Sequence, residues 1–401
     1  MTLVSAPAGL TIRTGEDADW PAMALLGATG FGSWRPQETN DMWRTLMPPD
    51  SVVLACDGRD VVGMALYLDL KLTVPGGAVV PMAGVSWVVV SPTHRRRGVL
   101  RAMFAELHGR MNACPVAGLE ASEAGIYGRF GYGPATVVQH VIVDRREARF
   151  HAEVPDPGGV RVARPVEHRG QLEDIDERWR LRTPGGLHTP ARMWEDVLAD
   201  RESARRGGSP LFCLLHHDGF ALYRVHGDGE KKTVEITKLA AVTPQAHIAL
   251  WRVLLGMDLI ESVGIQTHPD DVLPYLLTDH RLVRTTGVED ALWLRLLDIP
   301  TALEARGYAA DLSLVLDVSD DAPAGGRYAL DVRGGRARCV PTDAAADVHV
   351  SRSVLASLYM GAHRASAFTA ANRLRCNDSD LAAQLGAAFA TDIPAELGYG
   401  F

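Results

Sequence analysis

Two patterns of hydrophobic positions organise the first part of the chain. Short apolar, β-branched runs bounded by turn residues predict strands at residues 10–13, 51–57, 61–72, 79–90 and 116–120. A period of 3.6 residues predicts a helix over residues 98–111 and places on one of its faces Leu100, Met103, Phe104 and Leu107. Acidic residues open a further predicted helix at residues 17–26. Residues 79–120 therefore form a βαβ unit, whose connecting loop lies at the carboxyl end of the first strand.

A similar order of elements returns in the middle of the chain. A hairpin, a third strand and a helix are predicted at residues 211–217, 220–226, 233–241 and 244–255. The loop before this helix has no arginine and no glycine at the helix start, unlike the loop before residue 98. We therefore interpret this segment as a second copy of the fold that lacks a phosphate site.

The final hundred or so residues change character again. Short strands are predicted at residues 292–297, 312–318, 327–332, 337–339 and 348–350. Helices are predicted at residues 299–306 and 351–360, the second capped by Ser351. This pattern is typical of a small α+β domain.

The length of 401 residues is too great for one ordinary core and indicates two to three domains. A patch rich in proline and glycine at residues 151–159 is typical of a linker and marks the first boundary. We expect three domains, at residues 1–150, 151–290 and 291–401.

Composition narrows the class of protein. Hydrophobic residues make up 47% and charged residues 22% of the chain, which is normal for a globular protein. The net charge of −8 argues weakly against nucleic acid as a partner and is compatible with a cationic substrate, although an ordinary surface also carries such a charge. No apolar run is long enough for a transmembrane helix, and the N-terminus does not resemble a signal peptide.

The five cysteines are scattered and form no CxxC pair or zinc-type cluster. We expect no disulfide framework and no structural metal. A reducing, cytoplasmic environment fits this pattern best.

The loop before the helix at residue 98 is the strongest candidate for chemistry. A helix start presents free backbone N–H groups and the positive end of the helix dipole, which favour an anion. Three arginines, Arg95, Arg96 and Arg97, precede Gly98 and can pair with phosphates. This pattern predicts a binding site for a pyrophosphate group. The alternative is a solvated basic loop on a surface helix.

A second candidate is the tyrosine-containing segment at residues 126–132, which reads IYGRFGY. Tyrosine has a reference pKa of about 10 and is protonated at neutral pH, so Tyr127 could donate a proton to a leaving thiolate. The alternative is a packed aromatic ring with a satisfied hydroxyl.

Both motifs resemble the GCN5-related N-acetyltransferase (GNAT) superfamily. Arg95-Arg96-Arg97-Gly98 matches the first four positions of its Arg/Gln-x-x-Gly-x-Gly/Ala pattern, and Leu100 departs at the last. The whole strings HRRRGVLRAM and SEAGIYGRFGYGPAT resemble the narrower Eis-type (enhanced intracellular survival) acetyltransferases, with which that leucine agrees. The resemblance continues over nearly the full length, through VEITKLAAVTPQAHIALW and SLYMGA.

The resemblance implies an α/β (α+β) fold with tandem GNAT-like domains, the second cofactor-free, and a C-terminal domain like sterol carrier protein 2. It implies acetyl-CoA as cosubstrate, no metal, a homohexamer, and acetylation of several amines of an aminoglycoside, which would confer antibiotic resistance. A protein lysine is the alternative acceptor. An alternative of another class is a lipid carrier acting through the C-terminal domain. No nucleic acid or membrane span is expected.

The resemblance also carries over site residues by position. Tyr127 would be the general acid, and the terminal α-carboxylate of Phe401 would be the base. An α-carboxyl has a reference pKa of about 3.3–3.7 and so stays ionised, although a chain end can equally be frayed. Cofactor contacts would come from Val88, Val89, Val90, Arg96, Arg97, Gly98, Val99, Leu100, Arg101, Ser122 and Glu123.

The acceptor site for a polyamine would need acidic groups and aromatic faces. The candidates are Phe31, Trp34 and Trp43, of which Trp43 matches a family tryptophan. Each could equally be a core residue. Arg35 would add positive charge if it faced the cleft, which would restrict the range of aminoglycosides.

Overall fold

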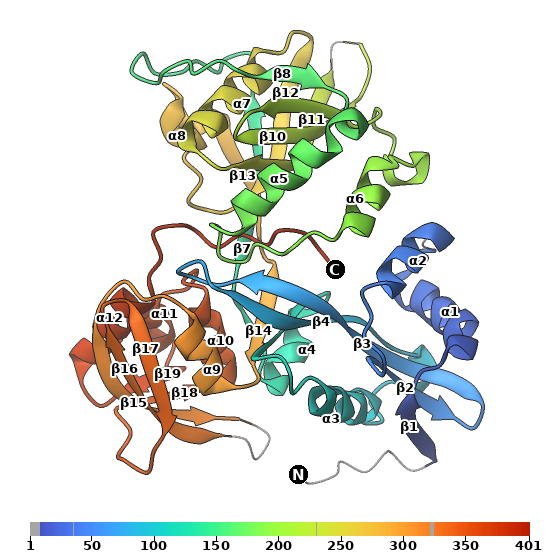
Figure 1. Cartoon of the computed structure of the whole chain (residues 1–401), viewed down its shortest axis with the longest axis vertical. Coiled ribbons are helices and arrows are strands. Elements are labelled where there is room, and N and C mark those ends of the chain that lie inside the picture. Colours follow the sequence, from blue (N-terminus) through green and yellow to red (C-terminus); the bar gives the residue numbers. More distant parts are fainter. Residues whose placement is uncertain (1–8, 35, 230, 321–324) are drawn as a thin grey trace. The chain divides into compact units, whose positions relative to one another are not determined.

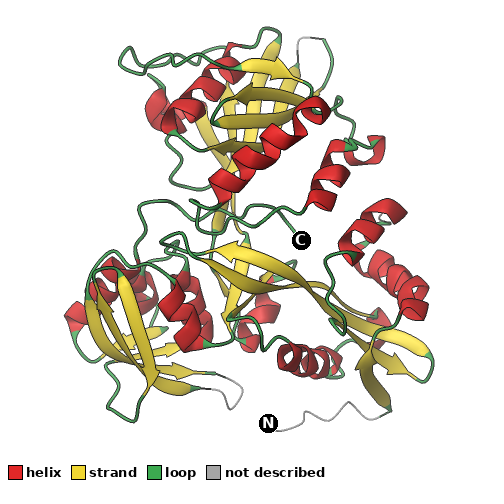
Figure 2. Ribbon diagram, in the orientation of Figure 1, coloured by secondary structure: helices red, strands yellow, loops and turns green. Residues whose placement is uncertain are grey.

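The computed structural model describes residues 9–34, 36–229, 231–320 and 325–401 (Figure 1). They form two compact units. The first contains Met1–Thr136, Ala291–Asp392 and Tyr399–Phe401, and the second contains Val137–Asp290 and Ile393–Gly398. Figure 2 shows the strands of the described residues in three sheets with helices packed against them. The mixed α/β fold class expected from the sequence is confirmed.

The first sheet belongs to the first unit. Its strands, in spatial order, are β1 (Leu10–Thr14), β2 (Val52–Asp57), β3 (Asp60–Thr73), β4 (Val79–Val90), β5 (Val116–Glu120), β14 (Leu292–Leu296) and β6 (Gly133–Pro134). Its helices are α1 (Trp20–Phe31), α2 (Gln37–Arg44), α3 (Val99–Arg110) and α4 (Ala124–Tyr127). The expected apolar face of α3 lies in the core: Met103, Phe104 and Leu107 are fully buried, and Leu100 packs at the edge.

The second sheet belongs to the second unit. Its spatial order is β13 (Val283–Asp290), β7 (Val137–Asp144), β12 (Ile260–Thr267), β11 (Lys232–Ala241), β10 (Gly219–His226), β9 (Phe212–His216) and β8 (Arg161–Ala163). Its helices are α5 (Arg169–Arg180), α6 (Ala191–Leu198), α7 (Pro244–Gly256) and α8 (Leu273–Leu276). The parallel pair β11–β12 flanks α7 as the parallel pair β4–β5 flanks α3, so the order of elements predicted from the sequence is repeated.

Two strands cross the boundaries expected near residues 150 and 290. β7 precedes residue 150 but pairs with β12 and β13 of the second sheet. β14 follows residue 290 but pairs with β5 and β6 of the first sheet. Each sheet is therefore completed by a strand from beyond its own expected segment.

The third sheet lies in the first unit and is formed by the C-terminal domain. Its order is β17 (Arg336–Pro341), β16 (Gly326–Arg333), β15 (Leu312–Ser319), β18 (Val348–Ser351) and β19 (Leu374–Cys376). Its helices are α9 (Ile299–Ala305), α10 (Arg352–Tyr359), α11 (Ala365–Ala370) and α12 (Ser379–Phe389). The expected cap is present, since the Ser351 hydroxyl accepts from the Val354 N–H. α10 is buried along its length and contacts this sheet as well as β14 and β6.

Short 3-10 helices complete the described structure: η1 (Asp17–Asp19), η2 (Pro92–His94), η3 (Gly128–Phe130), η4 (Pro165–His168), η5 (Glu202–Ala204) and η6 (His280–Leu282). All five cysteines are free thiols. No helix among the described residues has the length and apolar character needed to cross a bilayer.

Candidate active site

The central feature of the first sheet is a fork between two parallel strands. β4 and β5 pair only where Met82–Gly84 faces Val116–Gly118. Beyond those residues, β4 stays on β3 as far as Val90 and no longer pairs with β5. We call this opening the fork; it comprises residues 85–90 of β4 and 119–120 of β5. Backbone groups on the open edge of β4 are available to a ligand there.

A bulge in β4 accompanies the fork. The register between β3 and β4 shifts at Met64 and Leu66, and Trp87 has a φ of 52°, which is unusual for a bulky residue. Trp87 is buried and its ring lies 5.4 Å from that of Trp20. The bulge stands directly before Val88, Val89 and Val90, the three residues expected to contact the pantetheine arm.

The expected anion loop lies at the carboxyl end of β4. Arg95, Arg96, Arg97 and Gly98 are exposed, and none of the three arginines has an ion-pair partner among the described residues. Gly98 is the N-cap of α3 with a φ of 83°, a conformation that favours glycine. The first bond inside the helix runs from the Ala102 N–H to the Gly98 carbonyl, so the N–H groups of residues 99–101 are free for an anion.

A series of hydrogen-bonded side chains, which was not predicted from the sequence, links this loop to the end of β2. The Ser91 and Thr93 hydroxyls lie 2.8 Å apart, and Thr93 lies 2.8 Å from His94 Nδ1. His94 Nε2 in turn lies 3.2 Å from an Asp57 carboxylate oxygen at the end of β2. Only the position of His94 beside the arginine run could have indicated from the sequence that it belongs to this site.

Tyr127 ends α4, shortly after β5. Its side chain is 7% exposed, and its ring lies 6.0 Å from Phe104 and 6.4 Å from Tyr132. Burial, followed by the nearby Glu123 carboxylate, raises the pKa of Tyr127 above its usual value. The hydroxyl therefore keeps its proton throughout the physiological range. Ser122 and Glu123, also expected at the site, are exposed in the segment that joins β5 to α4.

The C-terminal residue lies at the fork. The backbone N–H of Phe401 donates to a Glu120 carboxylate oxygen at 2.9 Å. The Phe401 ring lies against Gly84, where an added Cβ would come within 3.0 Å of it. Glu120 ends β5 and Gly84 is the last β4 residue paired with β5, so the terminus meets both strands where they diverge.

Glu120 was not singled out from the sequence. It stands at the end of a predicted strand, within the string LEASEAGIYGRF, and nothing local distinguishes it from a surface residue. Desolvation of the carboxylate by the surrounding protein raises the pKa of Glu120, and the hydrogen bond from the Phe401 N–H lowers it in part. Its partner lies 281 positions away along the chain, which only the fold reveals.

The predicted acceptor residues lie on the helical segment after β1. Phe31 at the end of α1 is 47% exposed and Trp34 is 72% exposed, so neither is a core residue. Trp43 is half-buried in α2. Arg35 lies outside the described residues.

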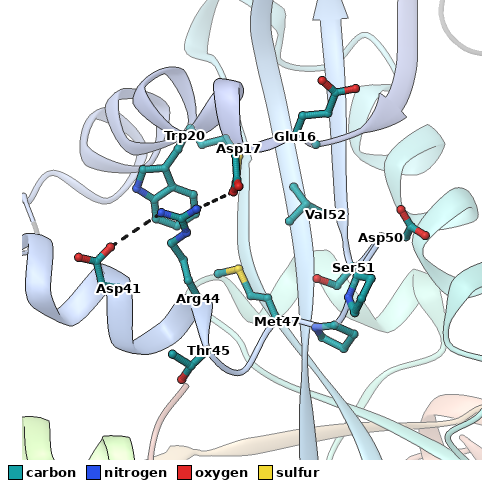
Figure 3. Close-up of a pocket in the computed structure, with 14 residues that line it drawn as sticks. Glu16, Asp17, Trp20, Asp41, Arg44, Thr45, Met47, Asp50, Ser51 and Val52 are labelled. Atoms are coloured by element: carbon teal, nitrogen blue, oxygen red, sulfur yellow. Dashed lines mark hydrogen bonds and ion pairs between the residues drawn. The ribbon is translucent and has the colours of Figure 1, made fainter.

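A cavity of about 530 Å³ opens beside the same two helices (Figure 3). Trp20 and Arg44 form one wall, with the guanidinium 4.7 Å from the ring centroid. Arg44 also pairs with Asp17 at 2.6 Å and lies 3.9 Å from Asp41. Phe31, Trp34 and Trp43 are not among its lining residues. Trp20 had no special signal in the sequence, and Arg44 already has two acidic neighbours.

Across the described parts of the chain, no three His, Cys, Asp or Glu side chains gather as a metal site would require.

Family models match the chain in three places. Residues 11–135 and residues 185–296 each match an acetyltransferase (GNAT) domain, and residues 299–395 match a sterol carrier protein domain. The α+β domain expected at the C-terminus is therefore of the carrier type, and the repeated order of elements reflects two GNAT domains.

Whole-chain comparisons agree with these matches. N-acetyltransferase Eis of Mycobacterium tuberculosis is 54% identical over 405 residues, covering 98% of this chain and 100% of that protein. An uncharacterized N-acetyltransferase of Streptomyces avermitilis is 35% identical, covering 97% and 99% of the two chains. The crystal structure of Eis1 from Mycobacterium abscessus superposes with a TM-score of 0.86 at 28% identity, covering 98% of this chain and 100% of that one.

The alignment with the Mycobacterium tuberculosis protein spans nearly the whole of both chains. Together with the GNAT matches, it shows that the chain is an N-acetyltransferase and belongs to the Eis family within the GNAT superfamily.

Proposed function

We propose that this enzyme transfers acetyl groups from acetyl-CoA to amines of aminoglycosides or similar polyamines, at several positions of one molecule. The observation that carries the proposal is the position of the chain end, with the Phe401 N–H bonded to Glu120 at 2.9 Å. The α-carboxylate of Phe401 at the fork could act as the base, so that no acidic or basic side chain is required for this role.

The donor half of the site is proposed from the fork and the loop. Arg96, Arg97 and the free N–H groups of residues 99–101 would bind the pyrophosphate of acetyl-CoA, with Gly98 setting the turn and Arg101 adding charge. The open edge of β4 along Val88, Val89 and Val90 would hold the pantetheine arm. Ser122 and Glu123 would line the same cleft from the β5 side.

The transfer would occur directly within a complex of enzyme, donor and acceptor. The acceptor amine attacks the thioester carbonyl while the Phe401 carboxylate, directly or through a water, takes the proton that the amine loses. The C–S bond then breaks, and the Tyr127 hydroxyl donates its proton to the departing thiolate. Return of the proton from the carboxylate to Tyr127 through solvent restores the enzyme.

The acceptor half is proposed from charge and exposure. Phe31 and Trp34 offer exposed aromatic faces, on which ammonium groups can rest. The chain carries a net charge of −8, which favours the approach of a polycation. We also propose a homohexamer and a reducing, cytoplasmic environment, in keeping with five free thiols.

The test is release of coenzyme A from acetyl-CoA in the presence of kanamycin, beside the same assay with a lysine-rich peptide. Mass spectrometry counts the acetyl groups added. We expect rapid acetylation of kanamycin at more than one amine. Acetylation of the peptide alone would replace the proposed acceptor with protein lysine. Bound acetyl-CoA without turnover of either acceptor would contradict the aminoglycoside assignment and favour another amine, or the lipid-carrier alternative.

A further inference from the structure

A buried ion cluster joins the C-terminal domain to the first sheet. Arg295 of β14 and Arg352 of α10 both contact one Asp320 carboxylate oxygen, at 2.9 Å and 2.8 Å. The three side chains are 8%, 4% and 2% exposed. Burying charges is costly unless they are paired and hydrogen-bonded, so such a cluster requires a well-defined geometry.

The cluster reaches the turn that follows Tyr127. Arg295 Nη1 donates to the Phe130 carbonyl of η3 at 2.5 Å. Arg352 donates to the Leu296 carbonyl of β14. Because η3 begins at the residue directly after Tyr127, the Arg295 bond lies only three residues beyond the proposed acid.

Glycines in this turn allow the close approach. Gly131 has a φ of 76°, and an added Cβ there would lie 2.0 Å from Arg295 Nη1. A Cβ on Gly133 would lie 1.9 Å from the Ser353 carbonyl of α10. The Phe-Gly-Tyr-Gly run is thus shaped to receive Arg295 on one side and α10 on the other, which a surface turn would not require.

Among the described residues, few other polar groups from outside the turn bond to it. Its internal bonds are those of a short turn, such as the Tyr132 N–H to the Tyr127 carbonyl at 3.3 Å. His108 of α3 lies 3.1 Å from the Tyr132 hydroxyl. The Tyr127 ring itself packs on aromatic neighbours, which restrict it less specifically than hydrogen bonds do.

We propose that Arg295 is a positioning residue for the reaction: held by Asp320 and Arg352, it sets the turn that aims the Tyr127 hydroxyl at the leaving thiolate. The C-terminal domain then contributes to catalysis by supplying two of the three members of this cluster. The inference rests on the proposed acid role of Tyr127.

The test is a double-mutant cycle of Arg295→Met and Tyr127→Phe, with kcat and the KM for acetyl-CoA measured separately. Arg295→Met should lower kcat by on the order of ten- to a hundred-fold, because a small misplacement of a catalytic group has effects of that size. KM for acetyl-CoA should change little, since Arg295 is not part of the anion loop. In the Tyr127→Phe background, Arg295→Met should have almost no further effect, as expected for residues that act as one unit.

Two further variants keep the test decisive if Arg295→Met folds poorly. Arg295→Lys keeps the charge opposite Asp320 and should recover part of kcat. Arg306→Met is the matched control, since Arg306 is a buried arginine of the C-terminal domain that donates to the Tyr359 and Phe389 carbonyls at 2.9 Å and 3.0 Å. It should lower the melting temperature while leaving kcat of the folded enzyme unchanged.

Two results would overturn the inference while leaving the proposed function intact: an unchanged kcat in folded Arg295→Met, or a loss of kcat in Arg295→Met or Arg295→Lys that is equally large with and without the Tyr127 hydroxyl. A Tyr127→Phe enzyme with unchanged kcat would instead remove the proposed acid and the inference with it.

Discussion

At the scale of single residues, the environment of each titratable group sets its state. Tyr127 and His108 lie beside the same aromatic ring, that of Phe104, at 6.0 Å and 5.4 Å. Burial keeps the tyrosine protonated and the histidine neutral, because it disfavours the charged form of either group. The neutral imidazole of His108 can share a hydrogen bond with the Tyr132 hydroxyl without adding charge to the site.

His108 gives a prediction about stability and pH. Burial, followed by the positive charge of Arg295, lowers the pKa of His108 to about 3. An unfolded histidine titrates at about 6.5, so the unfolded chain takes up this proton first. The free energy of unfolding therefore decreases as the pH falls below about 6.5, through this residue. The His108→Gln variant has no imidazole at this position and lacks this pH-dependent part of the free energy of unfolding. Its melting temperature should therefore fall less than that of the parent between pH 7 and pH 5.

Thermal unfolding of both proteins at the two pH values measures the difference directly. His268 also has a pKa lowered by burial and is present in both proteins, so it cancels in the comparison. An equal fall in the two melting temperatures would show that His108 is protonated in the folded enzyme.

The sequence identified single residues where a motif surrounded them. Tyr127 and the Arg95–Gly98 loop stood in recognisable strings, and the structure places the loop at a helix start and the tyrosine in a buried turn. Glu120 and Arg295 had no such context. Their partners, Phe401 and Phe130, lie 281 and 165 positions away along the chain. Contacts at such separations cannot be obtained from local spacing.

At the scale of elements, the strand–loop–helix unit joins the fork to the anion loop. β4 must leave β5 to open the fork, and the bulge at Trp87 accompanies that divergence. The strand then ends at Val90 and the helix begins at Val99, with Gly98 supplying the left-handed turn between them. The free N–H groups of α3 depend on this abrupt start.

Gly98 gives the prediction at this scale. Its φ of 83° is costly for any residue with a Cβ, by roughly 1–2 kcal/mol. Gly98→Ala should therefore destabilise the fold by about that amount and raise the KM for acetyl-CoA several-fold, since the helix start that would bind the pyrophosphate must shift. Denaturant unfolding and steady-state kinetics measure the two effects.

Gly170→Ala is the control for this substitution. Gly170 lies in α5, has no positive φ, and an added Cβ there would meet nothing within 4 Å. It should leave KM unchanged and stabilise the helix slightly. A Gly98→Ala enzyme with the parent's KM would show that the left-handed turn is not needed for the donor.

Strands were the most predictable elements. β4 and β5 match their predicted limits, and β2 and β3 lie within a residue of theirs, because alternating apolar runs have clear ends. The helices α2 and α5 were not predicted, since their mean composition is strongly polar and only a narrow face is buried. The exchange of β7 and β14 between sheets has no local signal at all.

At the scale of the whole molecule, the chain returns to its first unit twice. After the second domain, β14 enters the first sheet and leads into the C-terminal domain. After that domain, Ile393–Gly398 joins the second unit and Tyr399–Phe401 joins the first. The first sheet therefore needs β14 to connect β5 to β6, and the last three residues lie at its fork.

Under the proposed mechanism, this return is the way in which the C-terminal domain would contribute to acetyl transfer. The domain supplies Asp320 and Arg352 to the ion cluster with Arg295. It is also followed by the last segment of the chain, whose final residue, Phe401, bonds to Glu120. The sequence predicted three domains and pointed to Phe401 as a site residue, but the pairing of distant strands follows from the fold alone.

The central claim is that the terminal carboxylate of Phe401 is the catalytic base. The direct test is to add a single glycine after Phe401, which moves the carboxylate by one residue and leaves every side chain in place. We predict that acetyl-CoA binds with unchanged affinity, measured by calorimetry, while kcat with kanamycin falls by at least on the order of a hundred-fold, within the range for a lost acid–base group. A kcat equal to that of the parent enzyme would contradict the account.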